Sequence, residues 1–127
     1  TYNDAIRIID TIFNQNIQVI NPKVYAALVT QEGNTRPLVV VLKSDIDGVV
    51  WNRKSIGVYN ATRVGAFPEF KTVPNNNPVS YYNEDNKATV IARRVSNDTI
   101  EITTRNSDGE LSDNLLTNLY IEFNVYL

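Results

Sequence analysis

Histidine, cysteine and methionine are all absent from the 127 residues of this chain. Without histidine, the protein lacks the side chain that most often serves as a general base or a metal ligand. Without cysteine, disulfides and thiolate metal sites are excluded, and the redox compartment stays undetermined. No apolar run reaches the roughly 18 residues that a membrane-spanning helix needs. We therefore expect no histidine-dependent catalysis, no disulfide framework and no insertion into a membrane.

A concentrated positive charge is also missing. Twelve basic residues stand against fourteen acidic ones, which gives a net charge of −2. The basic residues are scattered along the chain, and Arg93-Arg94 is the one adjacent arginine pair. Nucleic acids and anionic membranes are bound by clustered lysine and arginine. We expect neither as a partner.

What is present is the composition of one folded domain. Apolar residues make up 43% and charged residues 20% of the chain, which is typical of globular proteins. Seventeen residues are asparagine, which favours turns and caps over helix interiors. The sequence begins at Thr1 without a methionine, so we expect a fragment or a processed product of a longer protein.

Residues 1–21 carry the one clear helical pattern. Apolar residues recur at alternating spacings of four and three, and the resulting stripe comprises Tyr2, Ile6, Ile9, Phe13, Asn16 and Ile20. Pro22 forbids continuation of the helix. The stripe fits a helix lying across a sheet. It also fits the last two heptads of a coiled-coil shaft, in which Asn16 would set the register or the oligomeric state.

Residues 22–127 have the pattern of a strand-rich domain. Short β-rich runs separated by turn residues occur at 24–30, 37–43, 55–67, 88–95 and 100–104. Residues 119–127 alternate apolar and polar side chains, as in a strand with one buried face. We therefore predict a mainly β fold: an antiparallel β-sandwich, jelly-roll-like, with one N-terminal α-helix.

No catalytic group is predicted. A Lys54-Ser55 dyad would place neighbouring side chains on opposite faces of a strand. A glycosidase needs two carboxylates across a cleft, but most of the available acids fall in turn-like segments: Glu69, Glu84, Asp85, Glu101, Asp108 and Glu110. We expect no enzyme activity and no cofactor.

The segment "SDIDG" at residues 44–48 resembles the beginning of a calcium loop. Asp45 and Asp47 stand two apart before Gly48, but apolar residues follow and the closing glutamate is missing. A turn between two strands explains the segment without a metal. We expect no metal site.

The segment "PNNNPVSYYNEDN" at residues 74–86 is either a recognition loop or a polar spacer. An aromatic ring can stack on the apolar face of a sugar while amides bind its hydroxyl groups. Tyr81 and Tyr82 would supply such a ring, Asn76 and Asn83 the amides, and Trp51 a second ring. Adjacent tyrosines in a strand face opposite sides, so at most one of them would join the platform.

The helical stripe, the asparagine- and tyrosine-rich β domain and the amphipathic last strand together resemble the small β domains of bacteriophage tail fibres, baseplates and head fibres. The resemblance covers the whole chain at the level of architecture, so no functional residue is carried over from it. It implies a homotrimer with Ile6, Ile9 and Phe13 at the three-fold axis. It also implies a host-surface glycan or another virion protein as partner, and a location on the virion or an extracellular surface.

The function that we expect is a non-enzymatic virion structural or attachment domain that acts by oligomerisation and surface binding. One alternative is a carbohydrate-binding module of a larger secreted protein, which the aromatic residues favour. Another is a pilin-like or surface-layer subunit, in which a helix lies on an antiparallel sheet.

Overall fold

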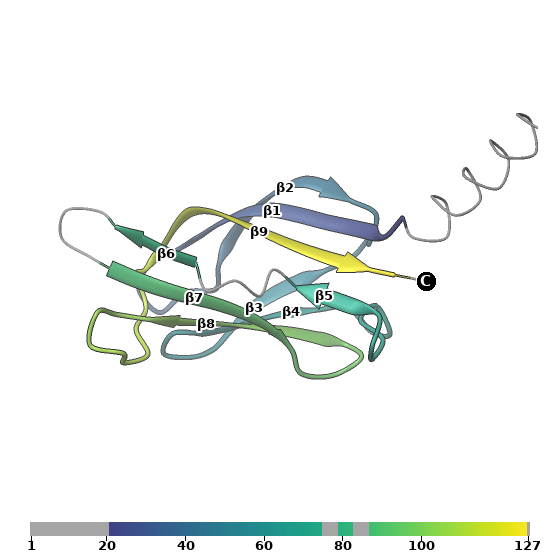
Figure 1. The fold of residues 1–127 in the computed structure, drawn as a ribbon. Coiled ribbons are helices and arrows are strands. Elements are labelled where there is room, and N and C mark those ends of the chain that lie inside the picture. The colour runs from purple at the N-terminus through teal and green to yellow at the C-terminus, as the bar shows by residue number, and fades with distance from the viewer. Residues whose placement is uncertain (1–20, 75–78, 83–86, 127) are drawn as a thin grey trace, which may run out of the picture.

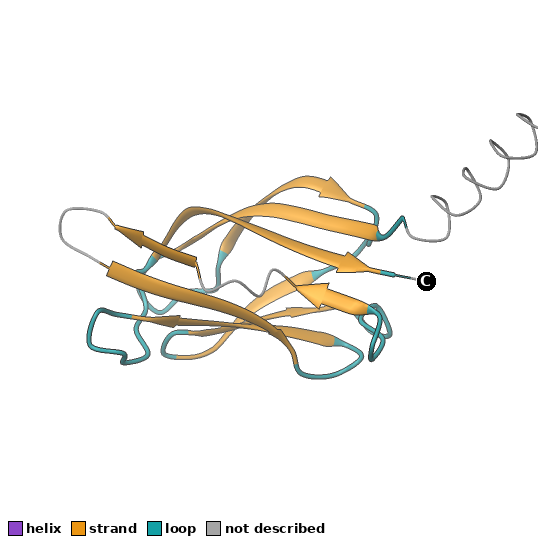
Figure 2. Cartoon of the chain, viewed as in Figure 1, coloured by secondary structure: helices purple, strands orange, loops and turns teal. Residues whose placement is uncertain are grey.

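A computed structural model describes residues 21–74, 79–82 and 87–126. These residues form nine β-strands, which are drawn as arrows in Figure 1 and in orange in Figure 2. The strands are β1 (Lys23–Gln31), β2 (Leu38–Ser44), β3 (Val50–Ser55), β4 (Val58–Thr62), β5 (Thr72–Pro74), β6 (Val79–Tyr82), β7 (Lys87–Arg94), β8 (Thr99–Arg105) and β9 (Leu116–Val125). Among the described residues, no helix has the length and hydropathy of a membrane span.

The strands form two antiparallel sheets that lie face to face (Figure 1). One sheet has the order β2-β1-β9-β5, and the other has the order β3-β4-β8-β7-β6. The predicted mainly β sandwich is therefore confirmed. The finer expectation of a jelly-roll-like arrangement stays a prediction. Here β6, β7 and β8 form a meander within one sheet, and β1-β2 and β3-β4 are neighbouring pairs.

The alternating C-terminal pattern forms β9, and its inward residues complete the core. Ile121, Phe123 and Val125 are buried, whereas Tyr120 and Tyr126 are exposed. β9 lies between β1 and β5, so both of its edges are hydrogen-bonded. A strand in this position is stabilised by the packing of its apolar face and by two ladders of backbone hydrogen bonds.

An aromatic cluster centred on Phe123 joins the two sheets. The rings of Tyr25 and Trp51 stack on Phe123 at centroid distances of 5.6 and 6.1 Å. Phe67 meets Phe123 edge to face at 5.9 Å. The indole Nε1 of Trp51 donates a hydrogen bond to the Tyr25 hydroxyl, with 3.0 Å between the two atoms. The polar atom of the indole is therefore satisfied inside the core, as buried tryptophan requires.

Two segments differ from the sequence-based prediction. Residues 55–67 were predicted as a single β-rich run, but Ser55 ends β3, Gly57 lies in the turn and Val58–Thr62 forms β4. Residues 74–86 were expected to be a loop throughout, but Val79–Tyr82 forms β6 and pairs with β7. The neighbouring strand decides the second case, because backbone pairing overrides the low strand propensity of the flanking asparagines. The helix expected over residues 1–21 lies outside the described residues, apart from Asn21.

Candidate functional site

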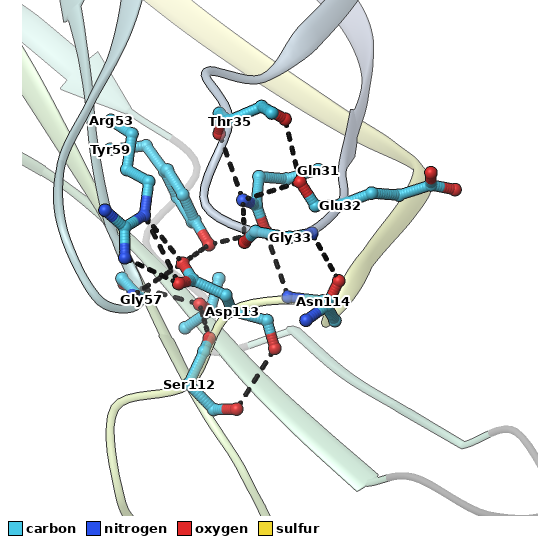
Figure 3. Close-up of polar contacts among 11 residues, drawn as sticks. Gln31, Glu32, Gly33, Thr35, Arg53, Gly57, Tyr59, Ser112, Asp113 and Asn114 are labelled. Carbon is cyan, nitrogen blue, oxygen red and sulfur yellow. Dashed lines mark hydrogen bonds and ion pairs between the residues drawn. The ribbon is translucent and has the colours of Figure 1, made fainter.

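Four polar side chains from separate segments meet in a partly buried cluster (Figure 3). It consists of Gln31 at the end of β1, Arg53 on β3, Tyr59 on β4 and Asp113 in the segment before β9. Arg53 binds Asp113 through a forked contact, with Nη2 2.8 Å and Nε 3.2 Å from Oδ2. The Tyr59 hydroxyl lies 2.7 Å from Asp113 Oδ1 and 2.8 Å from Gln31 Oε1. Its single proton is shared between these two acceptors.

Gln31 connects this cluster to the loop that follows β1. Its Oε1 accepts a hydrogen bond of 2.9 Å from the backbone N–H of Asn114. Its Nε2 donates to the carbonyl oxygens of Gly33 and Thr35, at 2.9 and 3.0 Å. The side chain is 1% exposed, so its amide is satisfied by protein groups rather than by bulk water. The cluster therefore fixes the loop after β1 against the segment before β9.

Neighbouring groups stabilise the ionised form of the Asp113 side chain. The hydrogen bond from Arg53 is the largest influence and lowers the pKa of Asp113 to about 2, although burial opposes this shift. The backbone N–H of Gly57 and the Tyr59 hydroxyl add donors to the same carboxylate. Burial is the main cause that raises the pKa of Tyr59, followed by its hydrogen bond to Asp113. A carboxylate held this firmly is a poor proton acceptor near neutral pH, so the cluster fits a structural role and not acid–base catalysis.

Gly57 is needed where the turn between β3 and β4 approaches the segment before β9. Its φ angle is +68°, and a Cβ atom placed there would lie 2.6 Å from the backbone nitrogen of Ser112. It would also lie 2.7 Å from the carbonyl oxygen of Thr104. This role of Gly57 was not predicted from the sequence. A side chain at this position would disturb both the turn and the hydrogen bond to Asp113.

The second feature is an exposed run of apolar residues on β2, which we call the apolar edge: Leu38, Val39, Val40, Val41 and Leu42. β2 pairs with β1 on one side, and no described strand pairs with its other side. Leu38 is 72% and Val40 60% exposed, and Val41 and Leu42 are at least half exposed. An edge strand presents unpaired backbone donors and acceptors, and here they lie beside apolar side chains. This combination is typical of a surface that pairs with another chain.

A shallow groove of about 380 Å³ continues this surface toward the edge of the other sheet. It lies between the start of β2 and the start of β3, and the residues that line it are Arg36, Pro37, Leu38, Val39, Val49, Val50 and Trp51. Val50 is half exposed at its rim. The apolar edge and this groove together form the candidate functional site.

A second pocket, of about 360 Å³, lies near the beginning of β1 and has mixed charge. Lys23 and Arg63 line it together with Asp45 and Asp47 of the segment that resembled a calcium loop. Asp45 Oδ2 accepts a hydrogen bond of 3.0 Å from the backbone N–H of Val24. Among the described residues, no group of three or more acidic side chains gathers to hold a metal. The cations in the lining make the pocket a weak candidate for calcium.

Trp51, predicted as an exposed aromatic platform, is instead a core residue. It is 6% exposed, and its indole N–H is bound to Tyr25. The sequence around a single tryptophan does not show whether its side chain is exposed or buried. Its burial depends on which strands pack against it in the folded domain. The carbohydrate platform therefore loses one of its two proposed rings.

The other predicted site residues are placed only in part. The backbones of Tyr81 and Tyr82 belong to β6, opposite Ala88 and Lys87. Asn76 and Asn83 lie outside the described residues, as do the predicted oligomer-interface residues Ile6, Ile9, Phe13 and Asn16.

The strand that contains the apolar edge was predicted from the run at residues 37–43, but its place at the edge of a sheet was not. The sequence feature that could have indicated this edge is the run "LVVVL", which consists of five consecutive apolar residues. Such a run fits a strand buried on both faces as well as an exposed one. The polar cluster left no comparable signal, because its four residues are separated by up to 82 positions.

Comparisons of the chain with protein-family models, with curated proteins and with solved structures found no match.

Proposed function

We propose that this chain is a non-enzymatic structural or attachment domain that acts by associating with other protein surfaces, as the appendage domains of virions do. The observation that carries the proposal is the apolar edge, with its neighbouring groove. Isolated apolar side chains are normal on protein surfaces, but a contiguous patch along an unpaired strand favours association. The proposed location is a virion or another extracellular surface.

The polar cluster supports a structural role over a catalytic one. Its carboxylate is occupied by Arg53, Gly57 and Tyr59, so it holds chain segments together without a free reactive group. The burial of Trp51 removes part of the motivation for a carbohydrate-binding module. A host-surface glycan or another virion protein remains part of the proposal as the partner of the assembled protein.

A homotrimer is the oligomeric state that we propose, on the basis of the apolar stripe in residues 1–21. The test is multi-angle light scattering of the full chain across a range of concentrations. We expect an oligomer for the wild type and for Asn14→Asp, which changes a polar position beside the stripe. The double variant Ile9→Asp/Phe13→Asp should have a lower mass, because charges on an apolar seam disfavour association. A wild type that stays monomeric at every concentration would contradict the proposal.

A further inference from the structure

The apolar edge has a property that points to one particular occupant. Read in either direction, the residues from Leu38 to Leu42 spell the same sequence, Leu-Val-Val-Val-Leu. Antiparallel pairing about a two-fold axis places each residue opposite its mirror position in the run. With the axis at Val40, Leu38 lies opposite Leu42 of a second copy and Val39 lies opposite Val41. Every opposed pair is then apolar and of similar size.

We propose that the apolar edge binds the same edge of a second copy of this chain, in antiparallel orientation, about a two-fold axis through Val40. This inference rests on the proposed function, because it names the partner of the associating surface. The contact would join two four-stranded sheets into one continuous eight-stranded sheet. A two-fold contact of this kind uses one self-complementary patch on both copies.

The faces of the two sheets agree with this register. Val39 and Val41 lie opposite the buried residues Val29 and Ala27 of β1, so they share the inward face. Val40 lies opposite Leu28 and belongs to the outward face. A two-fold axis perpendicular to the sheet keeps each face on its own side. Pairing Val39 with Val41 therefore joins inward residues to inward residues, as side chains opposite each other in a sheet require.

The pairing of β2 with β1 is regular from Leu38 to Val41, and it shifts at Leu42, because Ala27 lies opposite Val41 and Ala26 lies opposite Lys43. The proposed axis at Val40 therefore lies in the regular part of the strand. Within the run itself no charged residue opposes strand addition, although such residues commonly protect edge strands.

The absence of native cysteine allows a direct test of the register in the full chain. Residues directly opposite in an antiparallel pair have Cα atoms about 4.5–5.5 Å apart, which lies within the span of a disulfide. Val40→Cys should therefore crosslink to itself under mild oxidation with oxidised glutathione. Leu42→Cys should not, because its copy would lie four residues away, or roughly 13 Å along the strand. A mixture of Leu38→Cys and Leu42→Cys chains, one of them tagged, should form the mixed dimer.

The readout is a non-reducing gel, and Val64→Cys serves as the control for random collision because Val64 is exposed and lies outside the apolar edge. We expect the Val40→Cys dimer to exceed the Val64→Cys dimer by at least tenfold. Self-crosslinking of Leu42→Cys equal to that of Val40→Cys would overturn the register. Crosslinking of Val40→Cys no stronger than that of Val64→Cys would overturn the contact.

Light scattering of the full chain separates failure of this contact from failure of the proposed function. The two-fold contact would pair two of the proposed trimers into a hexamer. Val40→Lys should therefore halve the mass of the wild-type assembly, to that of a trimer, whereas the matched variant Val64→Lys should leave it unchanged. Far-ultraviolet circular dichroism verifies that both variants are folded. If the oligomer has the same mass in the Val40→Lys variant as in the wild type, the two-fold contact is wrong, but the proposed function is not contradicted. A wild type that is monomeric throughout would overturn both.

Discussion

The two strands that border the groove, β2 and β3, are both edge strands, but their side chains differ sharply. β2 has four exposed apolar residues, Leu38, Val40, Val41 and Leu42, around the partly buried Val39, and it ends in Lys43 and Ser44. β3 follows Val50 and Trp51 with the polar sequence Asn52–Ser55. Charged residues on an edge strand oppose the addition of another strand. β3 thus carries charged residues in its middle, whereas β2 carries one only near its end, and this difference supports the proposal that β2 is the edge that associates.

The charges of β3 are also tied to the body of the domain. Arg53 points to Asp113 in the polar cluster (Figure 3). Lys54 lies 3.6 Å from Glu101 on the outer face of the same sheet, and Glu101 also contacts Arg93 at 3.3 Å. These contacts hold β3 in place without a partner chain. No comparable ion pair involves β2 among the described residues.

The largest change in stability should come from removing the contacts that join β3 to the polar cluster. Asp113→Ala removes the acceptor of three donors and leaves partly buried polar groups without a partner. We expect the free energy of unfolding to fall by about 3 kcal/mol. The measurement is urea unfolding followed by the fluorescence of Trp51. The control Asp108→Ala, in an exposed turn, should stay within about 0.5 kcal/mol of the wild type. Equal stabilities of the two variants would show that the cluster does not anchor β3.

Low pH should weaken the same contacts, because it protonates Asp113. The pKa of Asp113 is about 2 in the folded chain and 3.8 in the reference state. Because the folded pKa is the lower one, the carboxylate stabilises the fold fully above about pH 4, and this contribution is lost as the pH falls toward 2. The contribution should amount to about 2 kcal/mol. We expect the difference in unfolding free energy between the wild type and Asp113→Asn to shrink by this amount between pH 5 and pH 2. A difference that is constant over this range would contradict the assignment.

Hydrogen exchange can compare the two edges directly. Amides of β2 that point away from β1 should be protected only when a second copy covers them. We therefore expect their exchange to slow by at least tenfold as the protein concentration rises through the range of association. Exchange of β3 amides should be independent of concentration. The measurement is residue-resolved exchange at two concentrations, and identical behaviour of β2 and β3 would remove the distinction between the edges.

The smallest effect is expected at Lys54. Its side chain is 60% exposed, and an exposed ion pair contributes little because water and salt screen it. Lys54→Ala should change the free energy of unfolding by less than about 0.5 kcal/mol. Thermal unfolding of this variant beside the wild type measures the change. A loss several times larger would mean that the charges of β3 stabilise the sandwich as well as protecting its edge.

The sequence predicted most of the strands because their patterns are local. The runs at 24–30, 88–95 and 100–104 correspond to β1, β7 and β8, and the alternation near the C-terminus corresponds to β9. β5 was missed because it has only three residues and ends in a proline. β6 was missed because asparagine and proline flank it, and its pairing with β7 is not visible in its own sequence.

The candidate site was less accessible to prediction than the fold. A run such as Leu38–Leu42 has the same composition in a central strand and in an edge strand. Trp51 has the same identity on a surface platform and in a core. In each case the function depends on which strand lies alongside, and that neighbour comes from a distant part of the chain.

The sequence by itself determined that this chain forms a β-rich domain without histidine or cysteine chemistry, because composition and period-two patterning are properties of the chain alone. Only the tertiary structure decided that β2 lies at the edge of its sheet among the described strands, that Trp51 belongs to the core, and that Gln31, Arg53, Tyr59 and Asp113 meet. The physical reason is that burial and hydrogen bonding depend on strand order, which is fixed when the whole domain packs and not by any single segment.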